Sequence, residues 1–258
     1  MNNLPFVTCI TPTYGRFAYL CEMVWCWINQ SYPNKELIIV NDQANLRITC
    51  DIPNVKVFNF NERFVGLGAK RNFAIAQANP MSQFICPWDD DDLFFPEHIE
   101  FLVSVFGEDT ALERARNAKH FVSIDNDFFN LSHDMNQTYF GASLFRKQVF
   151  IDYPFKDYLV MGEDADLFDH KRLNMKIEQN PLISSFVHRR GMGIPHASGV
   201  RQFSYDKGAQ DEIAKEFYMR TSQLREEVTL EIVPRLNSGK NLYEKIDRYR
   251  QDPANQIK

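Results

Sequence analysis

Four consecutive aspartates, Asp89 to Asp92, are the strongest chemical feature of this 258-residue sequence. They follow an apolar run and precede Phe94-Phe95-Pro96, where we expect the next helix to begin. Two carboxylates about 6 Å apart repel by roughly 3 kcal/mol at an effective dielectric constant near 20, so an acidic cluster in a cleft needs a nearby positive charge. A divalent cation supplies it, and all-oxygen ligands favour Mg²⁺ or Mn²⁺ over zinc. The alternative is a solvated turn whose charges favour the N-terminus of the following helix.

A second acidic cluster, Glu163-Asp164-Ala165-Asp166, follows Gly162 at the start of an expected helix. Like charges this close raise the pKa of one carboxyl group toward neutrality, which suits a general base. The alternative is that Asp164 caps the N-terminus of the helix.

Two glycines and two cations mark a third stretch, Gly66-Leu67-Gly68-Ala69-Lys70-Arg71. The glycines precede a helix start, and Lys70 and Arg71 lie on the first turns of that helix. Backbone N–H groups at a helix start, together with either cation, suit a diphosphate. Two alternatives stay open: tight-turn chemistry for the glycines, and a role for Arg71 as the counter-ion of the aspartates.

A histidine and two arginines, His188-Arg189-Arg190, follow a later apolar run. Neutral His188 can act as a metal ligand, and the arginines can contact phosphate. A purely structural role for His188 is the alternative.

The elements that must position these residues alternate between strand-like and helical patterns. Short β-branched runs predict the strands, and apolar side chains at helical spacing predict the helices between them. The expected strands are residues 6–11, 36–40, 55–58, 83–86 and 121–124, and the expected helices are 17–30, 69–78 and 165–175. This alternation predicts an α/β fold with a Rossmann-like, mixed but mainly parallel sheet flanked by helices. Ligands of such sheets bind at the carboxyl ends of strands, where the polar residues 11–14, 41–43 and 89–92 lie.

The end of the chain has a different pattern. Apolar residues at helical spacing predict a helix within 206–233, and an amphipathic segment at 242–249 follows Pro234 and Gly239. We therefore divide the chain into an α/β body, residues 1–204, and a helical C-terminal extension, residues 205–258.

Composition limits the classes of protein to which the chain can belong. With 44% hydrophobic and 24% charged residues it is neither disordered nor collagen-like. No apolar run reaches the roughly 18 residues of a membrane span, and the N-terminus lacks the basic stretch of a secretory signal. The five cysteines form no C-x-x-C pair, which favours a reduced, cytoplasmic compartment. A formal charge of −5 argues against a chain built mainly to bind nucleic acid.

Several stretches, taken in order, carry a family resemblance. They are Val7–Arg16, Glu36–Asp42, Gly68–Ala76, Phe84–Asp92, Gly141–Arg146 and Gly162–Leu167. Together they resemble the family 2 glycosyltransferases, which have the type A fold of nucleotide-diphospho-sugar transferases. The resemblance covers about residues 5–200, so residues 1–204 would form the catalytic domain.

The resemblance implies a donor site at the strand ends. In such enzymes the end of the first strand and the acid after the second strand hold the nucleotide base and the ribose. The matching residues here are Thr11, Pro12, Tyr14 and Asp42, with Arg16 nearby. The family often has an aspartate where this chain has Asn41, which leaves the contact with the base open.

The resemblance also implies positions for the metal and the base. The Asp-x-Asp motif of the family matches Asp89-Asp90-Asp91, with Asp91 as the metal ligand and Asp89 or Asp90 near the ribose. Because four aspartates leave the register open by one residue, Asp89 is a second candidate ligand. His188 corresponds to a histidine that some members place near the diphosphate. The Glu-Asp pair of the family matches Glu163-Asp164, with Asp164 as the base.

The implied reaction is an inverting transfer from a nucleotide-diphospho-sugar, by default a UDP-sugar, to an acceptor hydroxyl. Mg²⁺ or Mn²⁺, with Arg71 and His188, would stabilise the charge on the departing nucleoside diphosphate. Asp164 would remove the hydroxyl proton in a single displacement. The acceptor stays open between a glycan, a lipid-linked glycan, a protein, a small molecule and a modified base in DNA. The sequence carries no signature of an oligomeric state.

Two other functions remain open from the sequence. A nucleotidyltransferase would bind nucleotide and metal at similar strand ends, but it needs a phosphate-binding loop after the first strand, for which residues 13–16 are a poor candidate. A non-catalytic nucleotide-sugar or carbohydrate-binding protein would keep Asp42 and the aspartates without needing the pair Glu163-Asp164. Release of pyrophosphate would identify the first, and donor binding without turnover would identify the second.

Overall fold

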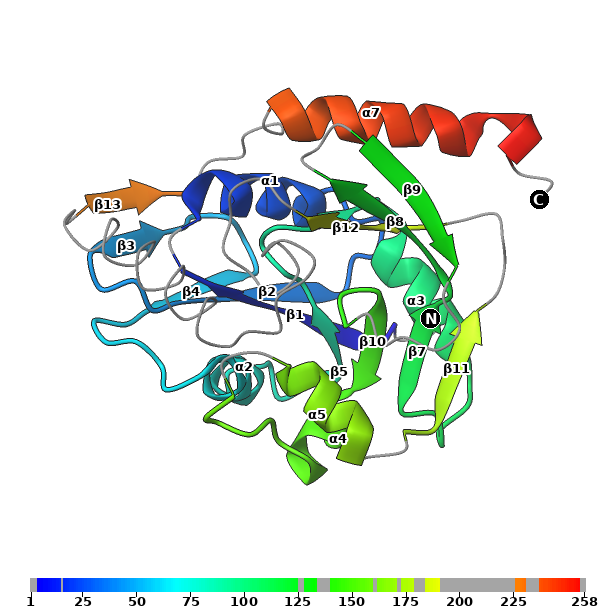
Figure 1. Cartoon of the computed structure of the whole chain (residues 1–258). Helices are drawn as coiled ribbons and strands as arrows, with labels where there is room; N and C mark the ends of the chain where they lie inside the picture. The colour runs from blue at the N-terminus through cyan, green and yellow to red at the C-terminus, as the bar shows by residue number, and fades with distance from the viewer. Residues whose placement is uncertain are drawn as a thin grey trace.

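The computed structural model describes residues 4–14, 16–124, 128–133, 140–159, 162–170, 173–178, 184–190, 226–230 and 237–255. A seven-stranded sheet lies at its centre, in the order β11-β7-β10-β5-β1-β2-β4 (Figure 1). Its strands are β1 (Phe6–Thr13), β2 (Lys35–Asn41), β4 (Val55–Asn59), β5 (Ser82–Pro87), β7 (Arg114–Asn117), β10 (Ser143–Arg146) and β11 (Met175–Glu178).

The middle of this sheet is parallel, as the alternating pattern predicts. β1 pairs in parallel with β2 and β5, and β2 pairs in parallel with β4. β10 runs antiparallel to both β5 and β7. β1 and β2 are buried along nearly their whole length, since helices cover both faces, and this accounts for their unbroken apolar runs. The expected α/β fold with a mixed, mainly parallel sheet is confirmed.

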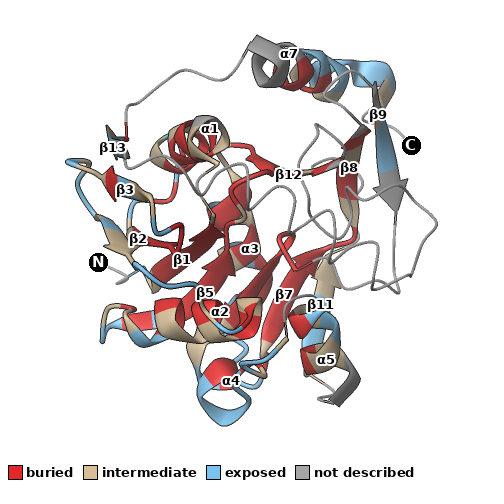
Figure 2. Ribbon diagram, turned by 60° about the vertical axis from the view of Figure 1, so that its left-hand side comes forward, coloured by how far each residue is buried: buried red, intermediate tan, exposed pale blue. Residues whose placement is uncertain are grey.

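Helices cover the two faces of the sheet and give each face its own core. They are α1 (Phe17–Ile28), α2 (Leu67–Ala76), α3 (His98–Phe106), α4 (Lys147–Asp152) and α5 (Glu163–His170). α1 and α3 pack with Cys9 and Ile39 on one face, and α2, α4 and α5 pack with Ile10 and Ile38 on the other (Figures 1 and 2). Successive strand residues alternate between the two cores because side chains along a strand point to opposite faces.

A second sheet lies beside the acidic residues. Its strands, in spatial order, are β6 (Leu93–Phe94), β12 (Phe186–Arg190), β8 (Lys119–Ile124) and β9 (Phe128–His133). The prediction that a helix starts at Phe94-Phe95-Pro96 is wrong, because Phe94 pairs with Phe186 and the Phe95 N–H donates to the Ser185 carbonyl at 2.9 Å. The chain is therefore extended here, and α3 begins only at His98.

The chain after residue 225 adds a strand and a helix to the body. β13 (Glu226–Thr229) pairs in parallel with β3 (Leu46–Thr49), so the predicted helix within 206–233 is wrong at these positions. The hydroxyls of Thr49 and Thr229 meet at 3.0 Å, and β-branched residues of this kind favour a strand. Residues 206–225 and 231–233 of the predicted helix lie outside the described residues.

The amphipathic segment at 242–249 is confirmed as part of α7 (Asn237–Gln251), which a 3₁₀ turn (Pro253–Asn255) follows. Tyr243 stacks on Phe95 with ring centroids 4.3 Å apart, so α7 packs against the chain that leads into α3.

The predicted helix over 165–175 is too long. α5 ends at His170, and Met175 begins β11. The Asn174 N–H donates to Glu113 Oε2 at 2.9 Å and the Asn174 carbonyl accepts the Glu113 N–H at 2.8 Å, which aligns this chain with β7.

All five cysteines are free thiols, and four of them are buried. They pack as small apolar side chains. Within the described residues, no helix combines the length and the apolar character that crossing a bilayer requires.

Candidate active site

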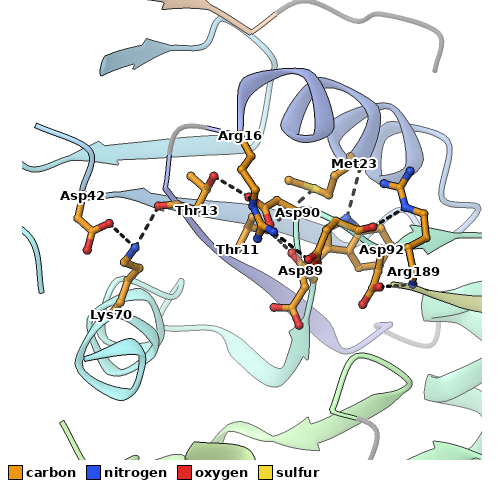
Figure 3. Close-up of polar contacts among 12 residues, drawn as sticks. Thr11, Thr13, Arg16, Met23, Asp42, Lys70, Asp89, Asp90, Asp92 and Arg189 are labelled. Atoms are coloured by element: carbon orange, nitrogen blue, oxygen red, sulfur yellow. Dashed lines mark hydrogen bonds and ion pairs between the residues drawn. The ribbon is translucent and has the colours of Figure 1, made fainter. Parts of the chain in front are cut away.

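The acidic residues 89–92 form a turn at the carboxyl end of β5, and the guanidinium group of Arg16 contacts this turn. Asp90 is fully buried, and its Oδ2 accepts hydrogen bonds from Thr13 Oγ1 at 2.7 Å and Arg16 Nε at 3.1 Å. Arg16 Nη2 donates to Asp90 Oδ1, and Arg16 Nη1 donates to Asp91 Oδ2 at 2.9 Å. Figure 3 shows Arg16 directed at Asp90 from the start of α1. Arg16 thus supplies much of the positive charge that the cluster requires.

The second sheet fixes the other end of the turn. Asp92 Oδ1 accepts the Arg189 N–H at 3.0 Å and lies 3.3 Å from His188 Nδ1. Arg189 Nε donates to the Asp91 carbonyl, and Arg189 Nη1 pairs with Glu22 Oε2 at 2.7 Å. Both members of this ion pair are fully closed from solvent. The expectation that Arg189 contacts a phosphate is therefore wrong, because its charge is used inside the protein.

Arg71 on α2 joins the two acidic clusters. Its Nη2 donates to Asp89 Oδ1 at 3.0 Å, and its Nε donates to Glu163 Oε1 at 2.9 Å. The guanidinium also lies 4.7 Å from the ring centroid of Phe140. Burial alone would lower the pKa of Arg71, but Asp89 and Glu163 raise it, so the guanidinium stays charged. The acidic turn and the start of α5 therefore face one another across Arg71.

The two acids at the start of α5 have different surroundings. Glu163 is buried against Arg71, and burial raises the pKa of its carboxyl group while Arg71 acts in the opposite direction. Asp164 is half-buried, and its Oδ1 accepts the N–H of Ala165 at 2.8 Å. Asp164 is the second residue of α5 and not its N-cap.

A buried ion pair marks the carboxyl end of β2. Lys70 Nζ donates to Asp42 Oδ1 and to the Thr13 carbonyl, the latter at 3.0 Å (Figure 3). Asp42 Oδ2 accepts the Phe64 N–H at 3.1 Å. Burial lowers the pKa of Lys70, although Asp42 acts in the opposite direction. The neighbouring Asn41 is fully buried and donates its amide to the first carbonyl of β3 at 2.7 Å, so its side chain serves the fold.

The remaining predicted donor residues lie at the end of β1. Thr11 is fully buried, and its hydroxyl donates to the Trp88 carbonyl at 2.6 Å, so this hydroxyl is turned into the fold. Pro12 is also buried. Tyr14 is half-buried, and the Arg63 guanidinium lies 4.9 Å from its ring centroid.

The glycines before α2 permit a close backbone contact. A Cβ atom on Gly66 would lie 2.4 Å from the Asp157 carbonyl oxygen, and one on Gly68 would lie 2.2 Å from the Lys156 carbonyl oxygen. The Gly68 N–H donates to the Leu159 carbonyl at 3.2 Å. The expectation that this N–H binds a diphosphate is therefore wrong, since residues 156–159 cover it.

A family model described as glycosyl transferase family 2 matches residues 8–155, more than half of the chain. The chain belongs to glycosyltransferase family 2. Among curated relatives, the uncharacterized glycosyltransferase YwdF of Bacillus subtilis is 32% identical over 97 residues, which are 36% of this chain and 35% of YwdF. The putative glycosyltransferase EpsH of Bacillus subtilis is 28% identical over 155 residues, which are 56% of this chain and 44% of EpsH. The chain thus matches less than half the length of these relatives.

Solved structures share the fold of this family 2 member. S. aureus TarS in complex with UDP-GlcNAc has a TM-score of 0.55 at 14% identity, covering 85% of this chain and 74% of the other. The mannosyltransferase PcManGT of Pyrobaculum calidifontis, in complex with GDP-Man and Mn²⁺, has a TM-score of 0.52 at 11% identity, covering 98% and 82%. The likeness concerns the fold, and it agrees with the type A fold expected from the sequence.

The acidic turn offers oxygen donors that fit a hard divalent cation. The side chains of Asp89 and Asp91 keep 26% and 10% of their surface exposed, whereas those of Asp90 and Asp92 keep 0% and 4%. Nowhere in the described part of the chain do three or more acidic, histidine or cysteine side chains converge on one point. Mg²⁺ is usually bound by one or two carboxylates together with substrate phosphates, so this donor set suits a cation that binds with a nucleotide diphosphate.

Two residues that fix the acidic turn, Thr13 and Glu22, do not stand out as functional in the sequence. Glu22 is a single acid within the apolar run Leu20–Val24. Because a buried charge needs an opposite charge beside it, such an isolated acid indicates a buried basic partner elsewhere in the chain. Thr13 lies in a polar cluster without a distinguishing pattern. The side chain of Arg190, expected to contact phosphate, lies outside the described residues.

Proposed function

We propose that this glycosyltransferase moves a sugar from a nucleotide-diphospho-sugar to an acceptor hydroxyl in a single displacement that inverts the anomeric carbon. The observation that carries the proposal is the Arg71 guanidinium, which binds Asp89 and Glu163 at the same time. Because of this contact, the acids suited to a cation and the acids suited to a base belong to one site. A protein that only binds nucleotide-sugars would not need the second acidic pair.

The donor would lie along α2. Asp42 and Lys70 lie at the carboxyl end of β2, where the nucleoside is expected, and Arg71 lies nearer the acidic turn. Within the described residues, Arg71 Nη1 is buried without a hydrogen-bond partner, and a diphosphate oxygen would satisfy it. A UDP-sugar is the default donor, and the structures of TarS with UDP-GlcNAc and PcManGT with GDP-Man support the class of nucleotide-sugars.

Asp91 and Asp89 would hold Mn²⁺ or Mg²⁺. His188 is a further candidate ligand, because a ring nitrogen that contacts a carboxylate, as Nδ1 does with Asp92, orients a histidine for a metal. When bound, the cation would neutralise negative charge on the leaving nucleoside diphosphate. Arg16 and the cation would compete for the Asp91 carboxylate, since Arg16 Nη1 binds Asp91 Oδ2.

Asp164 is better placed than Glu163 to act as the base. Glu163 is buried and bound by Arg71, whereas Asp164 keeps accessible surface. Asp164 accepts the proton of the acceptor hydroxyl while the hydroxyl oxygen bonds to the anomeric carbon. The bond between that carbon and the diphosphate oxygen breaks, and its electron pair leaves with the nucleoside diphosphate. The positive charge of Arg71 favours this departure.

The substitution Asp164→Asn tests the base. We expect kcat to fall by about 10²- to 10⁴-fold, which is the usual contribution of a general base, with donor affinity unchanged. The release of nucleoside diphosphate from UDP-GlcNAc and GDP-mannose measures turnover in the presence of Mn²⁺. Asp166→Asn is the matched control, because Asp166 pairs with Lys156 and has no assigned role in the reaction. Full transfer by Asp164→Asn would rule out the base, and turnover that EDTA leaves untouched would exclude the cation.

The proposal extends to the class of acceptor, the cellular compartment and the division into domains. A hydroxyl on a glycan, a lipid-linked glycan or a small molecule fits the reaction, and a modified base in DNA fits less well given the net charge of −5. The five free thiols support a reducing compartment such as the cytoplasm. Residues 1–204 would form the catalytic domain, with residues 205–258 as its extension.

A further inference from the structure

A side-chain amide on α2 binds the segment that leads into α5. Asn72 Nδ2 donates to the Phe155 carbonyl at 2.8 Å, and Asn72 Oδ1 accepts the Phe155 N–H at 3.0 Å. The same Nδ2 lies 2.9 Å from Asp157 Oδ1. One side chain therefore makes both backbone hydrogen bonds of Phe155, as a neighbouring strand would.

The two glycines bind the other end of the same segment. A Cβ atom on Gly66 would lie 2.6 Å from the Leu159 carbonyl oxygen, so the two backbones touch at this point. The Gly68 N–H donates to that carbonyl at 3.2 Å. Residues 155–159 are thus fixed to the first turns of α2 at both ends, and we refer to Gly66, Gly68 and Asn72 as the α2 clamp.

The clamped segment, residues 155–159, lies shortly before the proposed base in the sequence. Gly162, with a φ of 71°, turns the chain into α5, whose first residues are Glu163 and Asp164. The two residues before Asn72 bind acids on either side. Lys70 pairs with Asp42 at the donor end, and Arg71 pairs with one residue of each acidic cluster. Three consecutive residues of α2 therefore contact the donor end, the acidic turn and the segment that precedes the base.

We propose that Asn72 is a positioning residue, which with the rest of the α2 clamp sets the distance between the donor-binding residues of α2 and Asp164. The reaction step in this inference rests on the proposed function, whereas the clamp is independent of it. A misplacement of about 1 Å can lower a rate by about 100-fold, so loss of the clamp lowers kcat. Donor binding is retained because Lys70 and Arg71 are unchanged.

Hydrogen–deuterium exchange on the full chain tests the clamp without turnover. In Asn72→Ala we expect the amides of residues 163–168 to exchange at least about fivefold faster than in the wild type, because local opening becomes easier. Gln30→Ala is the matched control. The Gln30 amide donates to the Phe95 carbonyl at 2.8 Å and accepts the Ile99 N–H at 3.1 Å, so its loss should speed exchange at the start of α3 and leave α5 unchanged. Unchanged exchange of α5 in Asn72→Ala would overturn the proposal.

Kinetics test the link to the reaction, with UDP-GlcNAc and GDP-mannose as donors and Mn²⁺ present. We expect Asn72→Ala to lower kcat by about 10- to 100-fold with the donor KM within about twofold of the wild type. In Asn72→Asp the new carboxylate faces Asp157, and adding Asp157→Asn returns a hydrogen-bond donor there, so the pair should recover part of the lost kcat. A raised KM with unchanged kcat would overturn the positioning role. Faster exchange of α5 together with a fully active Asp164→Asn would leave the clamp intact and defeat the base assignment instead.

Discussion

At the scale of single residues, the ion pair between Glu22 and Arg189 places two opposite charges entirely out of contact with solvent. Arg189 also donates to the Asp91 carbonyl, so the pair fixes the acidic turn from behind. The sequence shows an acid in an apolar helix and an arginine in an apolar strand. It cannot show that the two meet, because α1 and β12 come together only in the folded chain.

Removing one partner of this ion pair should lower the free energy of unfolding strongly, whereas removing both partners should lower it much less. We expect Arg189→Met to lower the free energy of unfolding by about 3–5 kcal/mol, because it leaves the buried Glu22 carboxylate without a counter-ion. The double variant Glu22→Met with Arg189→Met should recover more than half of that loss. Urea denaturation at pH 7 measures both variants. Equal losses in the single and double variants would show that the pairing does not determine stability here.

At the scale of elements, long segments with a clear pattern are predictable and short ones are not. β1, β2, α1 and α2 carry enough apolar residues at one period to be found from the sequence. β7 is a four-residue strand, Arg114-Ala115-Arg116-Asn117, that carries no apolar strand pattern, yet every residue of it is buried. Arg114 is accommodated because its guanidinium lies 4.1 Å from the Phe168 ring centroid and donates to Ser143 Oγ. Such compensation depends on the assembled fold.

The contact of α2 with residues 156–159 reverses the usual effect of a glycine substitution. In an ordinary helix position, Gly→Ala stabilises by up to about 1 kcal/mol. At Gly68 the added methyl group would lie 2.2 Å from a backbone oxygen, so we expect Gly68→Ala to lower the free energy of unfolding by about 1–3 kcal/mol. Thermal unfolding measures the change. A melting temperature at or above that of the wild type would show that the backbones are not in close contact.

At the scale of the whole molecule, one buried histidine links folding stability to pH. His98 is fully buried beside the rings of Phe94 and Phe186 and bonds Ser185 Oγ at 2.9 Å. Burial lowers the pKa of His98 to about 3 from 6.5. Because the folded pKa lies below the unfolded one, the stability that His98 contributes is present above about pH 6.5 and is lost as the pH falls toward 3.

The variant His98→Phe isolates this contribution. We expect the wild type to lose up to about 1.4 kcal/mol per pH unit more than His98→Phe between pH 6 and pH 4, the slope for one proton. Denaturant unfolding at several pH values gives both slopes. Burial raises the pKa of Asp90 to about 6, and that contribution has the opposite sign: it is present below about pH 3.8 and lost as the pH rises through 6. Asp90 is present in both proteins, so parallel slopes would refute the assignment to His98.

The gathering of polar residues at one edge of the sheet could be predicted from the sequence, but the charge balance among them could not. Polar clusters at the ends of parallel strands indicate one site, because those ends lie along one edge of a sheet. The pairing of Arg16 with Asp90 and the bridge from Arg71 to Glu163 depend on rotamers and on the α5 segment, which no local pattern specifies. The prediction that the glycines before α2 bind a diphosphate is wrong for the same reason, since only the folded chain brings residues 156–159 into contact with them.

The most direct test of a site for cation and nucleotide at the acidic turn is a binding titration. UDP and GDP are titrated into the wild type and Asp91→Asn, each in Mn²⁺ and in EDTA. We predict that one of the nucleotides binds the wild type at least about tenfold more tightly in Mn²⁺, a gain of about 1.4 kcal/mol, and that Asp91→Asn loses this gain. Equal affinity in Mn²⁺ and EDTA for both nucleotides, or an undiminished Mn²⁺ effect in Asp91→Asn, would contradict a cation and nucleotide site at the acidic turn.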